Sequence, residues 1–386
     1  MINRSILPHL KELASLFPVV TILGPRQSGK TTLARAAFKN HAYANLELPS
    51  VRQLAIQDPK AFFANFPAPL IIDEAQHVPD LLSYIQSFVD EGKARGQYIL
   101  TGSHQPLLQA KVSQSLAGRT ALLTLLPLSI AELAAAGVKQ DRDEYLLKGF
   151  MPRLYDESIP PSLLYENYYR TYVERDVRML INVKDQNAFE TFVRLLAGRV
   201  GQVVNLESLS NDIGVTSPTL ASWLSVLEAS YIVFRLHPYY NNFGKRLIKS
   251  PKIYFTDVGL ASHLLRIEDR GQVARDPLVG GLFENLVALE AFKARFNAGR
   301  SPDLYYFRDR GGLEVDLLLE RGRELHAFEI KSARTWHAAF GRNVVKFGRN
   351  VAAVRSSGVI YAGEPVAGSE ERPACVNFMD AAALFD

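Results

Sequence analysis

The sequence of 386 residues contains a single cysteine, Cys375, and no long apolar run. One cysteine excludes an intramolecular disulfide and any zinc site built from cysteines. No segment approaches the roughly 20 consecutive apolar residues that a membrane-spanning helix needs, and the N-terminus lacks the apolar core of a signal peptide. We therefore expect a soluble, cytoplasmic protein that makes no membrane contact.

Strong charge of one sign, internal repeats and low-complexity tracts are also absent. The net charge of +4 permits an anionic partner without requiring one. The eight histidines show no spacing typical of metal ligands. Hydrophobic residues make up 47% of the chain, which is enough for sizeable cores, and the length predicts about two to four domains.

Residues 24–31 fit the phosphate-binding pattern G-x-x-x-x-G-K-[S/T] without a mismatch. Residues 17–23 before it predict a buried strand, and residues 32–38 after it have helix-forming composition. A glycine-containing turn between a strand and a helix directs backbone N–H groups and a helix dipole toward one anion. We expect Lys30 to reach the β- and γ-phosphates of ATP and Thr31 to ligate Mg²⁺; the alternative is an ordinary turn with a solvated lysine. The predicted nucleotide-binding residues are Gly24, Pro25, Arg26, Gln27, Ser28, Gly29, Lys30, Thr31 and Thr32.

A second motif supports nucleotide binding, because an apolar run over residues 69–72 ends in Asp73 and Glu74. Such a run places carboxylates at the carboxyl edge of a parallel strand, where the ligands of open α/β sheets bind. We expect Asp73 to hold Mg²⁺ through water and Glu74 to polarise the attacking water as a general base. An Asp-Glu pair alone is usually a solvated strand end, but its distance of about 40 residues from the loop suits a βαβ unit.

Residues 96–103 predict a third strand that ends in small hydroxyl residues. With this strand the chain resembles the AAA-type ATPases, in which a polar residue at the strand tip senses the γ-phosphate. The resemblance implies this role for Ser103, or otherwise for Thr101. It also implies that Arg119, which precedes another apolar strand, acts on the transferring phosphate across a subunit interface of a homo-oligomer. A surface arginine that caps the preceding helix is the alternative.

Residues 165–178 predict a helix rich in tyrosine and charge. Its segment Tyr172-Val-Glu-Arg-Asp-Val177 resembles one that recurs in a bacterial and archaeal group, in which an AAA-type ATPase is joined to a C-terminal domain of unknown function. The resemblance thus covers nearly the whole chain. The pattern favours a helix that packs between domains and has a solvated charged face.

Residues 205–228 predict a helix, a turn at Gly214 and a second helix. Four apolar residues of the second helix follow the i, i+3, i+4, i+7 spacing of a buried stripe, namely Leu220, Trp223, Leu224 and Leu227. The small hydroxyl residues Thr219, Ser222 and Ser225 lie on other faces, where they could contact DNA.

Residues 231–236 and 252–257 predict a hairpin that would form the wing of a winged helix. The hairpin is basic and aromatic and has no acidic residue between Tyr231 and Thr256. Its basic residues are Arg235, Lys245, Arg246, Lys249 and Lys252, and its aromatic ones are Tyr239, Tyr240 and Phe243. Basic side chains bind phosphates by counterion release, and aromatic side chains stack on unpaired bases, so DNA contact is the prediction. A solvated hairpin that mediates only protein contacts is the alternative.

The last part of the chain predicts a helix over residues 280–292 and a hairpin formed by residues 314–319 and 325–331. The short turn brings Asp316 close to Glu329 on the paired strand, and strand alternation places Glu329 and Lys331 on one side. The pattern leaves the register open by one residue.

This layout resembles the PD-(D/E)-x-K nuclease superfamily, although the aspartate comes in Glu-Val-Asp316 rather than after a proline. The resemblance implies that Asp316 and Glu329 bind Mg²⁺, that Lys331 orients or deprotonates the attacking water, and that Glu284 supplies an additional helical acid. The alternative is a hairpin with alternating charges on its exposed face and Lys331 paired to an acid.

Taken together, the motifs predict an α/β protein of three parts. These are an AAA-type ATPase domain with a parallel sheet at residues 1–150, a helical and winged-helix domain at residues 151–265, and a restriction-endonuclease-like domain at residues 266–386. The predicted activity is hydrolysis of Mg-ATP coupled to binding or metal-dependent processing of nucleic acid, with DNA as the expected partner. The alternative is an ATP-driven switch that acts through protein partners and has an inert nuclease-like domain.

Overall fold

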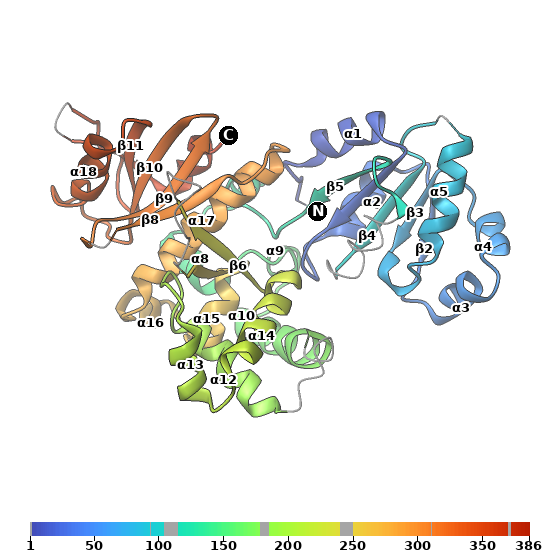
Figure 1. The fold of residues 1–386 in the computed structure, drawn as a ribbon, viewed down its shortest axis with the longest axis horizontal. Coiled ribbons are helices and arrows are strands. Elements are labelled where there is room, and N and C mark those ends of the chain that lie inside the picture. The colour runs from blue at the N-terminus through green and yellow to red at the C-terminus, as the bar shows by residue number, and fades with distance from the viewer. Residues whose placement is uncertain are drawn as a thin grey trace. The chain divides into compact units, whose positions relative to one another are not determined.

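The computed structural model describes residues 2–92, 94–103, 115–177, 185–239, 250–309, 311–369 and 372–386. The chain divides into two compact units. The first unit comprises Met1–Leu128 with the short segments Ala229–Tyr231 and Phe296–Arg300, and the second comprises Ser129–Glu228, Ile232–Arg295 and Ser301–Asp386. Figure 1 colours the chain from its N-terminus to its C-terminus.

The described part of the first unit contains a five-stranded parallel sheet in the order β2-β3-β4-β1-β5. Its strands are β1 (Val19–Leu23), β2 (Ala42–Asn45), β3 (Leu70–Asp73), β4 (Tyr98–Gly102) and β5 (Thr120–Thr124). Because all five strands run in the same direction, the residues that follow β1, β3 and β4 meet at one edge of the sheet. Candidate ligand-binding residues therefore converge at that edge.

Helices cover both faces of this sheet. Leu10 of α1 and Leu33 of α2 pack with Val20, Ile22 and other strand residues in one apolar core. On the other face, Phe63 of α4 contacts aromatic rings of α5 and β4. The helices are α1 (Leu7–Leu16), α2 (Lys30–Ala37), α3 (Pro49–Gln57), α4 (Pro59–Asn65) and α5 (Leu81–Glu91), with a 3₁₀ turn η1 (Ala75–His77) after β3. The first unit is thus a three-layer α/β/α domain, and the predicted α/β fold with a parallel sheet is confirmed.

The second unit begins with helices. They are α7 (Ile130–Ala135), α8 (Arg142–Lys148), α9 (Arg153–Asp156), α10 (Pro161–Tyr168), the π-helical segment η2 (Tyr169–Val177), α12 (Gln186–Ala197), α13 (Leu206–Ile213) and α14 (Ser217–Ala229). The predicted helix–turn–helix corresponds to α13 and α14, and α13 ends at Gly214 in a left-handed conformation, with φ of 82°. The predicted apolar stripe of α14 is buried throughout.

The described residues of the second unit also contain a seven-stranded mixed sheet in the order β12-β11-β10-β9-β8-β6-β7. Its strands are β6 (Val233–Pro238), β7 (Lys252–Phe255), β8 (Leu304–Arg308), β9 (Glu314–Arg321), β10 (Glu324–Lys331), β11 (Val354–Tyr361) and β12 (Ala374–Asn377). The remaining elements are α15 (Val258–Leu264), α16 (Arg270–Arg275), α17 (Val279–Asn297), α18 (Arg342–Asn350) and η3 (Phe378–Leu384). The predicted C-terminal hairpin is present, because β9 and β10 pair antiparallel.

The hairpin expected as a wing also pairs antiparallel, but its strands belong to the large sheet, since β6 pairs in parallel with β8. One sheet therefore crosses the predicted boundary at residues 265–266, and the division into three domains stays a prediction. In the parts of the chain described here, no helix is long and apolar enough to cross a bilayer.

Candidate functional site

The loop after β1 has a backbone that requires glycine. Gly24 has φ of 151°, and a Cβ atom there would lie 2.1 Å from the carbonyl oxygen of Leu125. Gly29 has φ of 91° and is the N-cap of α2. The loop therefore leads directly into a helix N-terminus, the arrangement that binds phosphate. All nine predicted nucleotide-binding residues lie in this loop and the first turn of α2.

Lys30 is only 5% exposed, and its ammonium group donates to main-chain carbonyls of the loop itself. Its Nζ lies 3.0 Å from the oxygen of Gly24 and 2.7 Å from that of Pro25. Burial lowers the pKa of Lys30 to about 8, although the charges of Glu74 and Asp73 oppose the shift. Among the described residues, the hydrogen-bond partners of Lys30 are thus neutral carbonyl groups rather than carboxylates.

Asp73 lies where the sequence places it, beside Thr31. The Thr31 hydroxyl donates to both carboxylate oxygens of Asp73, at 2.8 and 3.0 Å. Tyr43 of β2 donates to the same carboxylate at 2.8 Å, and Thr101 of β4 also donates to it. Mg²⁺ prefers such hydroxyl and carboxylate oxygens and completes its shell with waters and phosphate oxygens. The pair of Thr31 and Asp73 therefore fits the predicted Mg²⁺ site.

Glu74 follows Asp73 in a left-handed backbone conformation, with φ of 53°. Its carboxylate accepts hydrogen bonds from Ser103, at 2.9 Å, and from Gln76. Burial raises the pKa of Glu74, but the charge of Lys30 and these two hydrogen bonds outweigh burial and hold the pKa below its usual value. Glu74 is therefore ionised at neutral pH, as a general base must be. The structure brings Glu74 and Ser103 into hydrogen-bond contact at this edge of the sheet.

Arg119 does not lie at this edge of the sheet. It immediately precedes β5, whose first residue pairs with Val19 at the start of β1, so it lies a full strand length, about 15 Å, from the loop. Its guanidinium pairs with Asp90 at the end of α5. A role of Arg119 in the site of its own chain has no geometric support, and its predicted role across a subunit interface stays a prediction.

Three further residues belong to this site, and no sequence motif predicts their contacts. Arg4 donates to the carbonyl oxygens of Ser28 and Leu126 at 2.7 and 2.6 Å, which ties the loop to the segment after β5. Tyr43 and Gln76 bind the two acids directly. The sequence carried a signal only for Gln76, which stands two positions after Glu74.

The predicted C-terminal residues also come together. Asp316 of β9 accepts from the backbone N–H of Ile330 at 2.8 Å, and Lys331 contacts Glu329 at 2.6 Å and Asp316 at 3.9 Å. Both carboxylates are mostly buried, so this is no freely exposed hairpin face, although the alternative pairing of Lys331 with acids is present. We call this group the C-terminal acid cluster. Its acids are Glu284, Glu314, Asp316 and Glu329, and its lysines are Lys252 and Lys331.

Lys252 is the unexpected member of the C-terminal acid cluster. It is 2% exposed, and its Nζ lies 2.8 Å from Glu284, 2.7 Å from Glu314 and 3.8 Å from Asp316. The Tyr254 hydroxyl donates to the same oxygen of Glu284 at 2.6 Å. The prediction that Lys252 faces DNA is therefore wrong, because the side chain is buried among carboxylates.

Burial raises the pKa values of two carboxyl groups in this cluster. Burial, followed by repulsion from Asp316, raises the pKa of Glu284 to about 7, and the same two causes raise the pKa of Glu329 to about 7. Two of the acids therefore take up protons near neutral pH. In the described chain, no three side chains among His, Cys, Asp and Glu are arranged to hold a metal ion. The three acids predicted to bind metal here thus meet without forming a ready ligand set, and their metal role stays a prediction.

The predicted DNA-binding surface is described only in part. Ser222 and Ser225 of α14 are exposed, and Thr219 is half-buried. Arg235 pairs with Glu228 at 3.1 Å. Tyr239 contacts the ring of Tyr305. The other candidates on the hairpin, Tyr240, Phe243, Lys245, Arg246 and Lys249, lie outside the described residues.

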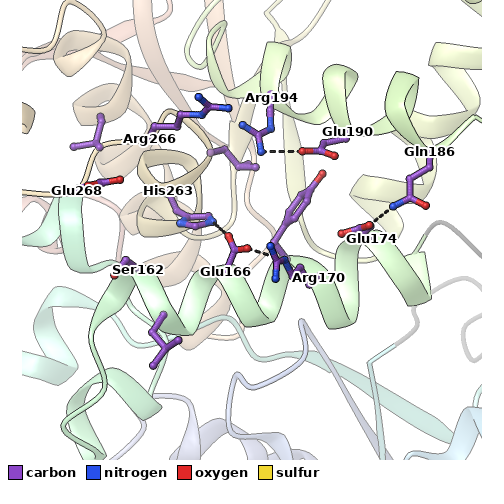
Figure 2. Close-up of a pocket in the computed structure, with 14 residues that line it drawn as sticks. Ser162, Glu166, Arg170, Glu174, Gln186, Glu190, Arg194, His263, Arg266 and Glu268 are labelled. Carbon is purple, nitrogen blue, oxygen red and sulfur yellow. Dashed lines mark hydrogen bonds and ion pairs between the residues drawn. The ribbon is translucent and has the colours of Figure 1, made fainter.

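The tyrosine-rich helix borders a charged pocket of about 1130 Å³ in the second unit. Figure 2 shows Glu166 between His263 and Arg170, and Arg194 paired with Glu190. Tyr165, Tyr168, Tyr172 and Val173 are buried on the other side of the helix. The side chains of Arg175 and Asp176 are not described. The helix thus has one face of buried tyrosines and one charged face toward the pocket, which is consistent with the expected packed face and charged face.

Comparison with protein families divides the chain into three matched segments. Residues 16–134 match the family described as AAA domain. Residues 139–271 match a domain of unknown function, DUF8612, and residues 279–380 match another, DUF4143.

Individual proteins extend the similarity. Protein Rv2008c of Mycobacterium tuberculosis is 31% identical over 337 residues, which cover 86% of this chain and 74% of the relative. Mb2031c of Mycobacterium bovis matches equally. Among solved structures, the Walker-type ATPase PABY2304 of Pyrococcus abyssi aligns with a TM-score of 0.45 at 16% identity, over 69% of this chain and 96% of that one.

Proposed function

The chain belongs to the family of the mycobacterial protein Rv2008c and carries an AAA domain, and from this premise we propose that it is a Mg²⁺-dependent ATP hydrolase. The AAA domain supports binding and hydrolysis of ATP. The observation that carries the proposal is the contact between Thr31 and Asp73 beside the glycine-containing loop, because phosphate and Mg²⁺ need these groups at one place.

Each side chain of the site has a role in this proposal. Lys30 moves from the loop carbonyls to the β- and γ-phosphates, and Thr31 and Asp73 hold the Mg²⁺ that neutralises phosphate charge. Glu74 takes a proton from the attacking water. Ser103, whose hydroxyl donates to Glu74, senses whether the γ-phosphate is present.

Titration of a fluorescent ATP analogue tests the binding step. Lys30→Ala should weaken binding by about 100-fold or more, because it removes the ammonium group that we assign to the β- and γ-phosphates. The matched control is Lys39→Ala, an exposed lysine that directly follows Phe38 at the end of the same helix. Equal affinity of the wild type and Lys30→Ala would contradict the assignment of the site.

A second candidate function is metal-dependent processing of nucleic acid by the C-terminal acid cluster. The convergence of Glu284, Asp316, Glu329 and Lys331 favours it, as does Glu329 Oε2, which is buried without a hydrogen-bond partner among the described residues. In this case Asp316 and Glu329 would hold the cation, and Lys331 would orient the water. The test is cleavage of single- and double-stranded DNA with Mg²⁺ or Mn²⁺; cleavage must disappear in Lys331→Ala.

Lys252 favours the other candidate, a nucleotide-driven switch whose C-terminal half binds partners without cutting. A lysine within 4 Å of three carboxylates supplies the positive charge that a metal would otherwise bring. If neither Mg²⁺ nor Mn²⁺ supports cleavage of DNA, we propose that the protein acts as this switch. Stimulation of ATP hydrolysis by DNA would identify nucleic acid as the partner, whereas indifference to DNA would point to a protein.

Assembly of subunits and a cytoplasmic location are further parts of the proposal. An action of Arg119 on a neighbouring subunit requires a homo-oligomer, in which turnover per subunit rises with protein concentration. A turnover that is independent of concentration, in both the wild type and Arg119→Ala, would exclude this role.

A further inference from the structure

Gln76 has an arrangement that the sequence motifs do not explain. It lies in the turn η1 directly after the acid pair and is 9% exposed. Its amide nitrogen donates to Glu74 Oε2 and lies 3.4 Å from the Ser103 hydroxyl, which itself donates to the same Oε2 at 2.9 Å. Gln76, Ser103 and Glu74 therefore form one hydrogen-bonded group beside the phosphate loop.

The chemistry of the carboxylate fixes how the amide is turned. An ionised carboxylate only accepts hydrogen bonds, so the NH₂ group of Gln76 must face Glu74 and its carbonyl oxygen must point away. This carbonyl oxygen, Oε1, is buried and has no hydrogen-bond partner among the residues that the structure describes. A buried acceptor without a partner lowers the stability of the fold. The orientation of the amide thus provides a hydrogen bond to Glu74, and the unpaired carbonyl oxygen lowers the stability of the fold.

We propose that Gln76 is a positioning residue for Glu74 in ATP hydrolysis, an inference that rests on the proposed function and deepens it. The amide of Gln76 holds the Glu74 carboxylate in the orientation that faces the attacking water. Because Ser103 donates to the same oxygen, Gln76 also links the general base to the residue that we assign to sensing the γ-phosphate. A γ-phosphate that binds the Ser103 hydroxyl would draw it away from Glu74 and leave Gln76 as the remaining donor to Glu74.

The test is a comparison of Gln76→Met with the wild type, because methionine has a similar length and no hydrogen-bonding amide. We expect kcat for ATP hydrolysis to fall about 10- to 100-fold, within the range that a general base contributes. KM and the dissociation constant for ATP should stay within about twofold. The thermal midpoint should not fall, since the unpaired carbonyl is removed with the donor. Gln53→Met, at an exposed position of α3, is the matched control.

A further readout separates positioning from a structural role. Gln76→Glu should be least active at high pH and recover as pH falls, because only the protonated carboxyl group can donate to Glu74. An unchanged kcat in Gln76→Met would overturn the inference, as would a loss of kcat that follows an equal loss of ATP affinity and thermal stability. A wild type that binds but never hydrolyses ATP would instead overturn the proposed function.

Discussion

The nucleotide site and the C-terminal acid cluster use the same residue types in opposite ways. At the nucleotide site, Asp73 and Glu74 accept from neutral hydroxyl and amide donors, and Lys30 contacts main-chain carbonyls. In the C-terminal acid cluster, Lys252 and Lys331 contact the carboxylates directly. A lysine held by neutral carbonyls keeps its charge available for a phosphate, whereas a lysine between acids is already neutralised. The neighbours of a lysine, rather than its presence, thus distinguish a ligand site from an internal ion pair.

The largest expected effect that sharpens this comparison is on stability. Lys252→Met should lower the free energy of unfolding by about 3 kcal/mol or more, because it removes a buried cation from the partly buried carboxylates of Glu284 and Glu314. Chemical denaturation measures the loss. Lys331→Met is the comparison variant and should cost less, because the Lys331 side chain is one third exposed and solvent partly screens its contacts. Adding Glu284→Gln to Lys252→Met should restore part of the stability; equal stability of the wild type and Lys252→Met would show that the cluster does not need its cation.

The second effect is the pH dependence of stability. The folded-state pKa values of Glu284 and Glu329 are raised to about 7 from the ordinary value of 4.5. Because the folded protein then binds more protons than the unfolded chain, the contribution of these groups is fully present below about pH 4.5 and is lost as pH rises through 7. Denaturation of the wild type and Glu284→Gln at several pH values should show a shallower dependence in the variant. Parallel curves would contradict the raised pKa.

The third effect is on ATP affinity. Lys30 has a pKa of about 8, so the free protein loses the cation for the phosphates above that pH. Affinity for ATP should fall toward tenfold for each pH unit above 8 and change little below it. Titrations between pH 6.5 and 9.5 measure this, and Lys30→Ala should show no such break. An affinity that is constant to pH 9.5 would mean that Lys30 keeps its proton.

The smallest effect is expected at Arg119. This arginine and Asp90 form an exposed ion pair, which contributes little to stability because water and salt screen it. Arg119→Ala should therefore leave the thermal midpoint unchanged within error. Any change in the ATP turnover of Arg119→Ala, measured over a range of protein concentrations, then reflects contact between subunits rather than a loss of stability. A clear drop in the midpoint would show that Arg119 has a structural role instead.

The nucleotide site was predictable where its signals are local in the chain. Residues 24–31 and Asp73 carry chemistry that depends on fixed spacing and on the end of an apolar strand. Arg4 and Tyr43 were not predictable, because each reaches the site from a segment without a motif, and the contact depends on tertiary packing.

In the C-terminal half, the hairpin was predictable because its turn is short, and the structure places Lys331 in contact with both Asp316 and Glu329. Lys252 was misjudged for a physical reason. Its neighbours in sequence are basic, but its partners Glu284 and Glu314 come from α17 and β9, 32 and 62 positions further along the chain. A local charge pattern cannot show which distant carboxylates fold over it.

The most direct test of the central claim is single-turnover hydrolysis of ATP in the presence of Mg²⁺, by the wild type and by Glu74→Gln. Glu91→Gln, at an exposed position of α5, is the matched control. We predict that the wild type and Glu91→Gln hydrolyse bound ATP, whereas Glu74→Gln binds it with similar affinity and hydrolyses it at least about 100-fold more slowly. Equal hydrolysis by Glu74→Gln and the wild type would contradict the claim that this edge of the sheet is an ATP-hydrolysing site.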